Sequence, residues 1–407
     1  MCNQCNDESL DNGPVSPGRR KLLSLAGTGL AASPLLGPLA AGAQNQAAPS
    51  PVDPEPFKVR AYGVADTKAQ FTPMQIQRRA VGPRDVVIDI LYCGVCHSDV
   101  HAAHGDWGST TFPRVPGHEI IGRVAAVGKA VTKFRVGDIA GVGCMVDSCG
   151  ECENCLADRE QNCLKGTTFT YDAPDKVSGG VTYGGYSERV VVTERFAIRI
   201  PPGVDLAATA PLLCAGVTTF SPMQHWRLQP GQRVGIIGLG GLGHVAVKLA
   251  AARRADVTVF TTTPGKLADA RRLGAREAIL SSDPAAMARL ANQFDLLVST
   301  VPYSFKMQPF MDLLKLDGTL VNVGLLLNLD GTELSGMNLG FGRKSLAGSM
   351  IGGIAETQEV IDYCAARKIT ADIELIRPDQ ITQAFERVVN KDVRYRFVID
   401  FASPRRA

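Results

Sequence analysis

The sequence lacks a charge excess, a basic block and an aromatic-rich composition. Its 43 basic and 40 acidic residues leave a net charge of +3 over 407 residues, and only 6% of the residues are aromatic. The charges are spread along the chain, without the cluster of Lys and Arg that a nucleic-acid-binding protein uses against phosphates. At 45% hydrophobic and 20% charged, the chain is also unlike a disordered or fibrous protein. We therefore expect a globular protein of about two domains that has no nucleic-acid partner.

An uninterrupted apolar run long enough to cross a membrane is also missing near the N-terminus. The apolar stretch at residues 22–43 is broken by glycines and prolines, which makes it a poor transmembrane helix. An arginine pair at residues 19–20 precedes this stretch, and small residues at 41–43 offer a cleavage site. This order resembles a twin-arginine export signal; a low-complexity tail with a chance arginine pair is the alternative.

We predict a twin-arginine-type signal segment over residues 1–43 and a proline-rich linker over residues 44–56. The prediction implies recognition by the twin-arginine export machinery, a periplasmic or exported location and no stable membrane insertion. The alternative location is the cytoplasm.

The rest of the chain divides into two parts that differ in the pattern of their apolar residues. Residues 57–213 contain short alternating or apolar runs separated by glycines, which favours a β-rich, barrel-like domain. Residues 214–348 alternate apolar strands with helical stretches, among them an expected helix at 241–254 and an expected strand at 319–326. This pattern predicts a parallel sheet with crossover helices. Residues 349–407 hold two helical stretches and a last strand at 395–400, and we expect them to complete the first domain. The predicted fold class is α/β.

A glycine-rich string lies where the first strand of the second domain meets a helix. It matches G-x-G-x-x-G, follows an apolar strand and opens a helical run, which is the context that a dinucleotide site requires. The glycines allow a tight turn and close approach of a pyrophosphate, and the helix N-terminus supplies a positive dipole. Glycines that merely close a strand–helix turn are the alternative. The predicted cofactor-binding residues are Gly238, Leu239, Gly240, Gly241, Leu242 and Gly243.

The end of the next strand favours NADP over NAD. An NAD site carries a carboxylate there for the ribose hydroxyls, but the acid of this strand, Asp256, stands at its beginning. Thr261, Thr262, Thr263 and Lys266 follow the strand. These residues can donate to a 2′-phosphate, which a carboxylate would repel. Lys266 on a solvated helix face is the alternative, and NADP(H) is the predicted cofactor.

The cysteines are odd in number and clustered. Seven of the eleven lie between residues 93 and 163, which is unlike a disulfide framework. Four of them follow the spacing C-x2-C-x2-C-x7-C, namely Cys149, Cys152, Cys155 and Cys163. Four thiolates at this density suit a closed tetrahedral zinc site that stabilises a loop. A ferredoxin-type cluster would need a shorter last gap followed by proline, and disulfides are the other alternative.

Several ordered motifs resemble one family. They are Gly94–His101, Val115–Glu119, the four-cysteine loop, Pro211–Thr219, the glycine string and Asp392–Asp400. Together they are similar to the zinc-dependent medium-chain alcohol dehydrogenases, in particular the cinnamyl-alcohol-dehydrogenase-like branch. The resemblance runs from about residue 57 to residue 400. It implies a GroES-like catalytic domain, a Rossmann domain, two zinc ions per subunit, an alcohol or aldehyde substrate and a homodimer.

The resemblance also implies the roles of particular residues. Its catalytic zinc ligands are Cys96, His118 and Cys214, with Glu119 as an alternative ligand; Asp99 orients His118, and Ser98 and His101 pass a proton between substrate and solvent. Two thiolates, one imidazole and a vacancy form a catalytic zinc set, and the carboxylate behind the imidazole fixes its orientation. His104 and His225 are interpreted as ordinary polar histidines.

The sequence says less about the substrate than about the metal and cofactor sites. Plant members of the branch that reduce phenylpropanoids carry aromatic side chains at two pocket positions. An ungapped reading places Thr168 and Met350 there, neither of which is aromatic, and Phe169 and Trp107 lie nearby. The loss of the two aromatic side chains argues against a pocket dedicated to phenylpropanoids. We therefore expect a broad-specificity NADPH aldehyde reductase or alcohol dehydrogenase. The alternatives are a polyol or amino-alcohol dehydrogenase of the same superfamily, and a non-catalytic zinc- or nucleotide-binding protein on this scaffold.

Overall fold

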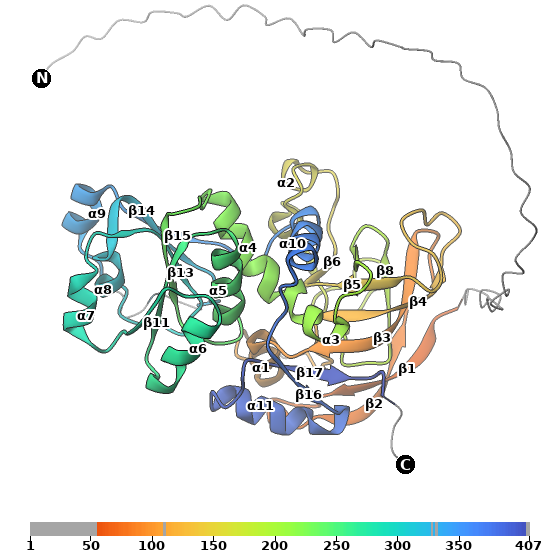
Figure 1. The fold of residues 1–407 in the computed structure, drawn as a ribbon. Coiled ribbons are helices and arrows are strands. Elements are labelled where there is room, and N and C mark those ends of the chain that lie inside the picture. The colour runs from red at the N-terminus through yellow and green to blue at the C-terminus, as the bar shows by residue number, and fades with distance from the viewer. Residues whose placement is uncertain (1–54, 109–110, 327–328, 330–332, 404–407) are drawn as a thin grey trace, which may run out of the picture. The chain divides into compact units, whose positions relative to one another are not determined.

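A computed structural model describes residues 55–108, 111–326, 329 and 333–403 of the chain (Figure 1). The predicted signal segment, residues 1–43, and nearly all of the predicted linker lie outside these described residues. The described chain contains two main β-sheets, each of which organises one lobe.

The sheet of the first lobe is formed mainly by antiparallel strands. Its members are β3 (Asp85–Gly94), β4 (Ile120–Val127), β5 (Ile139–Val142), β8 (Arg189–Thr193), β9 (Ala197–Arg199), β16 (Ile373–Ile376) and β17 (Arg396–Asp400). The order is β16-β17-β3-β4-β5-β9, and β8 pairs with β3. Two smaller pairs accompany it: β1 (Phe57–Gly63) with β2 (Thr72–Arg78), and β6 (Met145–Asp147) with β7 (Thr168–Phe169). Because β17 pairs with β3, the end of the chain joins the first sheet.

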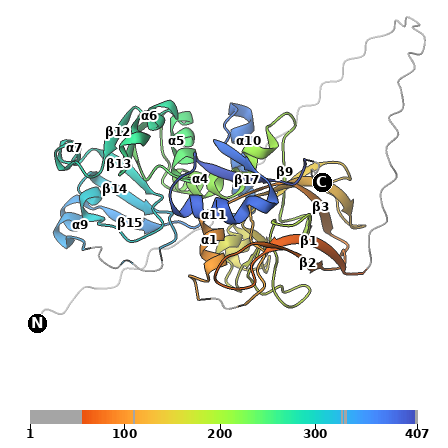
Figure 2. The same ribbon diagram turned by 90° about the horizontal axis from the view of Figure 1, so that it is seen from below.

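The second lobe is a six-stranded parallel sheet with the order β12-β11-β10-β13-β14-β15. Its strands are β10 (Arg233–Ile237), β11 (Asp256–Thr261), β12 (Glu277–Leu280), β13 (Phe294–Ser299), β14 (Leu314–Asn322) and β15 (Ser345–Gly348). The order reverses between β10 and β13, as in a doubly wound sheet, where ligands bind at the carboxyl ends of the strands. Figures 1 and 2 show helices on both sides of this sheet.

Helices cover both faces because successive strand residues point to opposite sides. Ile236 packs in one buried cluster with α4 (Ala215–His225), α5 (Gly243–Ala252) and α6 (Leu267–Arg272). Its neighbour Ile237 packs in another cluster with α7 (Pro284–Arg289), α8 (Gln308–Met311) and α9 (Gly336–Gly342). The run of apolar residues that predicted a strand is therefore explained by burial on both faces.

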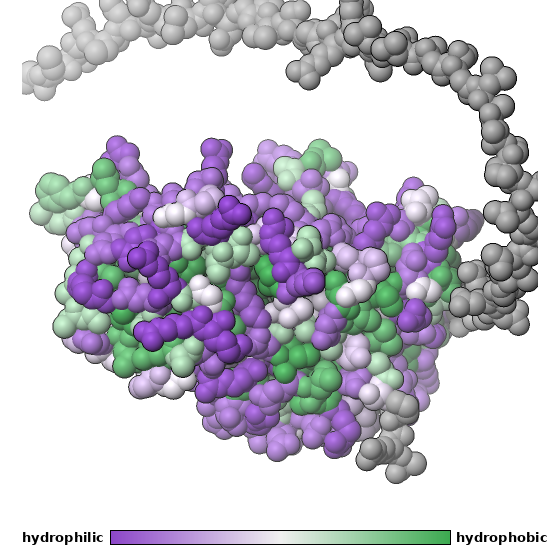
Figure 3. Space-filling model, in the orientation of Figure 1, coloured by the Kyte–Doolittle hydropathy of each residue, from purple (hydrophilic) through white to green (hydrophobic). Residues whose placement is uncertain are grey.

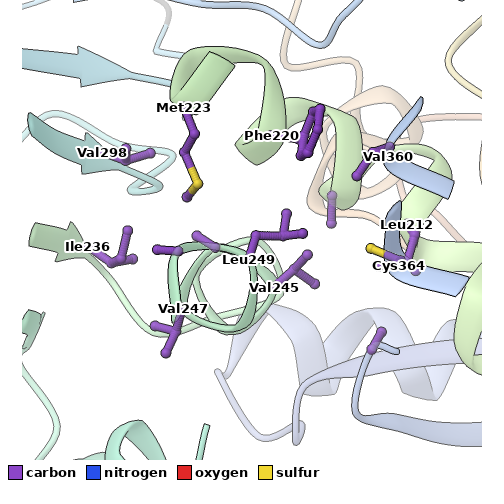
Figure 4. Packing of buried hydrophobic residues seen from close by; sticks show 14 of the residues in the cluster. Leu212, Phe220, Met223, Ile236, Val245, Val247, Leu249, Val298, Val360 and Cys364 are labelled. Carbon is purple, nitrogen blue, oxygen red and sulfur yellow. The ribbon is translucent and has the colours of Figure 1, made fainter. Parts of the chain in front are cut away.

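One core joins the two lobes. Figure 4 shows Val245 and Leu249 of α5 lying among Phe220 of α4 and Val360 of α10 (Ile354–Arg367). The same buried cluster reaches Ile121 of the first sheet. Side chains of both lobes therefore pack in a continuous apolar interior, which fixes the cleft between them.

Sequence reasoning placed most strands and helices of the second lobe within a few residues. The helix expected at 241–254 is α5, and the strand expected at 319–326 is β14, which begins at Leu314 instead. The start of β14 escaped prediction because Lys315 and Asp317 are exposed and break the apolar run. No helix was expected at α4, whose residues are nearly all buried and so show no amphipathic period.

Among the described residues, no single helix is long and apolar enough to cross a membrane, although the bent pair Leu206–Leu213 and Ala215–His225 passes the test together. The two helices of this pair are bent by 53° at their junction. Nearly all their residues are buried in the protein core, which explains their apolar composition.

Candidate active site and zinc sites

A large cleft of about 1070 Å³ lies between the lobes. The start of α1 (His97–His104) lines it from the first lobe, and the glycine string at 238–242 lines it from the second. Its other walls include residues 169–172, 300–303, 305–306 and 348–351. The cleft therefore brings together the predicted metal ligands, the predicted relay and the predicted cofactor loop.

Asp99 organises the first-lobe side of the cleft. Its carboxylate is fully buried and accepts from the backbone N–H of Cys96 at 2.8 Å, which caps the start of α1. It also accepts from the backbone N–H of Gly117 at 3.1 Å and from the hydroxyl of Tyr186 at 3.0 Å. His118 Nδ1 lies 3.1 Å from Asp99 Oδ1. One carboxylate thus holds two loops, so that Cys96 and His118 face the same point.

The backbone at Gly117 explains why this position must be glycine. Its φ is +104°, which side chains rarely adopt, and a Cβ there would lie 2.6 Å from the ring of Tyr186. The conformation directs the following residue, His118, toward Cys96.

Four buried donors converge at this point. One ligand atom from each of Cys96, His118, Glu119 and Cys214 lies within 4.8 Å of the others. The two sulfurs are 3.9 Å apart, close to the spacing of about 3.8 Å that two thiolates about 2.3 Å from a tetrahedral zinc would have. Among the described residues, Glu119 Oε2 is buried without a hydrogen-bond partner. The donor types, the spacing and this orphaned oxygen fit a zinc ion.

The electrostatics of the cluster favour a thiolate at Cys96. The thiol of Cys214 hydrogen-bonds to Cys96 and, with Arg396 and His118 nearby, holds the pKa of Cys96 well below its ordinary value. Burial raises the pKa of Glu119 to about 7, although the positive charge of Arg396 acts to lower it.

Arg396 is a residue whose role sequence reasoning missed. Its guanidinium donates to Glu119 in a fully buried ion pair. The same side chain packs on the glycine string, since a Cβ added at Gly241 would lie 2.7 Å from its Cδ. Arg396 therefore contacts both the metal cluster and the cofactor loop. The only sequence signal was its place in the last matching motif, to which no role had been assigned.

The predicted relay residues lie on the same helix and line the cleft. Ser98 Oγ is 3.6 Å from Cys96 Sγ. His101 Nδ1 is 2.7 Å from a carboxylate oxygen of Asp106, while His101 Nε2 is buried and has no hydrogen-bond partner among the described residues. The carboxylate keeps the proton on Nδ1, so Nε2 is free to accept one. Asp106 was also missed, because its role depends on the turn that ends α1.

The second cluster lies in the loop around α2 (Glu153–Leu156). One sulfur from each of Cys149, Cys152, Cys155 and Cys163 lies within 4.8 Å of the others. Backbone N–H groups of Cys155 and Leu164 donate to Cys152 and lower its pKa to about 6. The sulfurs of Cys149 and Cys155 are 3.8 Å apart, again the spacing of tetrahedral zinc ligands. All four cysteines are free thiols in the structure, so the residues fit a structural zinc.

The cofactor end of the cleft suits a phosphate. Thr261, Thr262, Thr263 and Lys266 all line it, and Lys266 Nζ donates to the carbonyl of Leu239 in the glycine string at 2.9 Å. Asp256 begins β11, at the opposite end of the strand, where Arg276 pairs with it. Asp172 is the only carboxylate among the described lining residues, and it pairs with Arg114 on the first-lobe side. No described lining residue offers a carboxylate for an NAD ribose.

Comparisons with known proteins agree with this geometry. Residues 82–202 match the model of the alcohol dehydrogenase GroES-like domain, and residues 241–366 match that of the zinc-binding dehydrogenase. The chain belongs to the zinc-binding alcohol dehydrogenase family. The predicted α/β fold, with a GroES-like and a Rossmann-type part, is confirmed.

Individual relatives agree with the cinnamyl-alcohol-dehydrogenase-like branch. The chain is 51% identical over 348 residues to NADP-dependent alcohol dehydrogenase C 1 of Mycolicibacterium smegmatis, covering 85% of this chain and 99% of the relative. It is 49% identical over 345 residues to aldehyde reductase YahK of Escherichia coli, covering 84% and 98%. A cinnamyl alcohol dehydrogenase structure from Sorghum bicolor matches with a TM-score of 0.83 and 40% identity, covering 86% and 99%.

Within this dehydrogenase, one expected pocket position is wrong. Thr168, which pairs in β7, is buried and does not line the cleft. Phe169, Met350 and Trp107 do line it, and all three are partly exposed. An ungapped reading cannot follow the strand alternation that decides which of two neighbours faces a pocket.

Proposed function

We propose that this alcohol dehydrogenase is a broad-specificity, zinc-dependent aldehyde reductase that uses NADP(H). The observation that carries the proposal is the single cleft joining the four-donor cluster at Cys96 to the glycine string and the threonine–lysine group. A cleft of this kind places a carbonyl oxygen near the cluster and its carbon near the cofactor.

The roles of the chain's residues follow from this arrangement. Cys96, His118 and Cys214, with Glu119 beside them, would hold a zinc that polarises the carbonyl for hydride transfer from NADPH. Ser98, beside Cys96, would donate the hydrogen bond that delivers the proton to the substrate oxygen. His101 lines the cleft, and its Nε2 would replace this proton from solvent, with Asp106 holding its Nδ1 proton.

The cleft favours apolar aldehydes over polyols. Its wall carries Trp107, Phe169 and Met350, and its only described carboxylate is tied to Arg114. A polyol site would need several convergent polar groups for its hydroxyls. This wall supports aliphatic and aromatic aldehydes of medium size as the proposed substrate class.

The test is NADPH consumption by purified, zinc-loaded protein with a panel of aldehydes, before and after chelation. We expect turnover with medium aliphatic and aromatic aldehydes, lower turnover with NADH, and loss of activity in chelator. Failure of zinc-loaded protein to reduce any aldehyde would contradict the enzyme assignment and favour a non-catalytic binding protein.

Replacing Ser98 by alanine is expected to lower kcat about 100-fold, within the range for losing a positioned proton donor. Zinc content should stay at two per chain, because Ser98 is in neither cluster. His104→Ala is the matched control on the same helix, since His104 Nδ1 bonds the carbonyl of Thr67 and His104 does not line the cleft. An unchanged kcat in Ser98→Ala would remove the relay from the proposal.

The homodimer that the resemblance implies has a candidate surface. β15 lies at the edge of the second sheet and pairs with β14 alone among the described strands. Nearby, Met337 and Phe341 of α9 are 69% and 82% exposed, and Figure 3 shows hydrophobic surface over this helix. Exposed apolar residues beside a free strand edge favour association. The molar mass of the wild type and of Phe341→Glu, measured by light scattering, tests this. A monomeric mass for both proteins would contradict the dimer.

Export of the folded enzyme remains a proposal based on residues 1–43. Folding before export would let both zinc sites form inside the cell, where thiols stay reduced. Fractionation of cells that make the chain with its native N-terminus tests this: full-length protein found only in the cytoplasm would contradict it.

A further inference from the structure

His244 is a fully buried titratable side chain that the proposed reaction does not use. It directly follows the glycine string and lies in the first turn of α5. Its Nδ1 is 3.2 Å from the carbonyl oxygen of Gly240, and its Nε2 accepts the backbone N–H of Asp372 at 3.1 Å. Both ring nitrogens are therefore engaged, one with the cofactor loop and the other with the first lobe.

These two partners determine the protonation of the ring. The N–H of Asp372 can only donate, so Nε2 must carry a lone pair and the single ring proton must be on Nδ1. The carbonyl of Gly240 then accepts that proton. Burial, with Lys248 and Arg396 adding positive charge nearby, lowers the pKa of His244 to about 3. The ring is consequently a neutral Nδ1–H donor over the whole physiological range.

The acceptor of this bond is the peptide group between Gly240 and Gly241. Two glycines leave a peptide group easy to rotate, and Gly240 carbonyl also accepts the backbone N–H of His244 at 3.0 Å. In a trans peptide the C=O and N–H point in opposite directions. Fixing this carbonyl toward α5 therefore directs the N–H of Gly241 out of the helix N-terminus, on the side of the cleft that both glycines line.

The ring itself is held by the first lobe. It stacks on Tyr395 with ring centroids 5.0 Å apart and an interplanar angle of 14°. The carbonyl of Asp372 accepts the backbone N–H groups of Tyr395 and Arg396 at 3.0 and 3.2 Å. The carboxylate of Asp372 pairs with Lys248 of α5 at 2.5 Å. His244 thus lies where the loop of one lobe meets the strand start of the other.

We propose that His244 is a positioning residue for the dinucleotide: its Nδ1–H fixes the Gly240–Gly241 peptide so that the Gly241 amide is presented to the cofactor pyrophosphate. The inference rests on the proposed function, because it concerns binding of the same NADP(H). It assigns no contact between His244 and the substrate or the cofactor.

Three substitutions of His244 test the hydrogen bonds of Nδ1 and Nε2 separately. Asparagine places an amide nitrogen near the position of Nδ1, glutamine reaches the position of Nε2, and phenylalanine keeps the stacked ring without either nitrogen. We expect His244→Phe and His244→Gln to raise the KM and Kd for NADPH about five- to tenfold, the effect of losing one hydrogen bond. His244→Asn should stay within about twofold of the wild type, and kcat should change little in all three.

Val245→Ala is the matched control, since Val245 is equally buried in α5 and packs in the core. It should lower Tm without changing the KM for NADPH. Equal KM in His244→Phe and wild type, or an asparagine variant no better than glutamine, would overturn the proposal. If His244→Phe does not fold, the asparagine–glutamine pair still decides.

Direct binding of NADPH, followed by its fluorescence without aldehyde, separates this inference from the proposed function. A wild-type enzyme that does not bind NADPH would contradict the proposed function itself. A wild type that binds NADPH and reduces aldehydes, with unchanged affinity in the phenylalanine and glutamine variants, would contradict only the role of His244.

Discussion

Replacing Cys214 by serine is expected to abolish aldehyde reduction while leaving one zinc ion per chain. The change removes one of the two thiolates of the buried cluster, in which the sulfurs of Cys96 and Cys214 are 3.9 Å apart. Lewis-acid catalysis supplies several kcal/mol of transition-state stabilisation, so loss of about 4 kcal/mol would lower kcat about a thousandfold. Metal analysis of the purified variant, together with steady-state kinetics, measures both effects.

Cys364→Ser is the matched control for this experiment. Cys364 is also buried, but it lies in α10 within the apolar core and belongs to neither cysteine cluster. This variant should keep two zinc ions and nearly full activity. If Cys214→Ser also kept two zinc ions and full turnover, the buried cluster would not be the catalytic metal site. Loss of both zinc ions would indicate general unfolding instead.

Introducing an aspartate at Thr262 is expected to reverse the cofactor preference. Thr262 is exposed directly after β11 and lines the cleft beside Lys266. A carboxylate there would oppose the 2′-phosphate, and juxtaposed like charges cost several kcal/mol. The kcat/KM for NADPH should fall about 100-fold, whereas NADH should gain because the new acid can accept from its ribose hydroxyls. The ratio of the two kcat/KM values is the measurement.

Ala288→Asp provides a control for added charge. Ala288 is exposed on α7 of the same lobe and does not line the cleft. It should leave the NADPH-to-NADH ratio unchanged. An unaltered ratio in Thr262→Asp would mean that the threonine–lysine group does not bind the phosphate, and that NADP(H) is selected elsewhere.

The sequence alone determined the features whose residues are close together in the chain. The four cysteines of the α2 loop lie within fifteen positions, so chain connectivity alone brings them near one another. The glycine string was legible for the same reason, because a strand, a turn and a helix follow one another directly. The absence of a carboxylate directly after β11 could also be inferred from the sequence, since Asp256 lies at the start of that strand.

Tertiary structure decided which distant residues act together. Cys96 and Cys214 are separated by 118 positions, and Arg396 and Glu119 by 277. Spacing carries no information about such contacts, because packing of strands and helices from different parts of the chain creates them. From the sequence, only the resemblance to a family pointed to the first pair, and it assigned no role to Arg396.

The physical reason for this division is the range over which each constraint acts. Turn geometry, helix starts and loop-bound metals depend on neighbouring residues, so the amino-acid order determines them directly. Packing decides which side of a strand faces a pocket, as with Thr168 and Phe169. It also decides which hydrogen bonds a buried ring makes, as with His244. The sequence thus determined the zinc loop and the dinucleotide loop; the fold decided how the cleft joins them to the buried cluster.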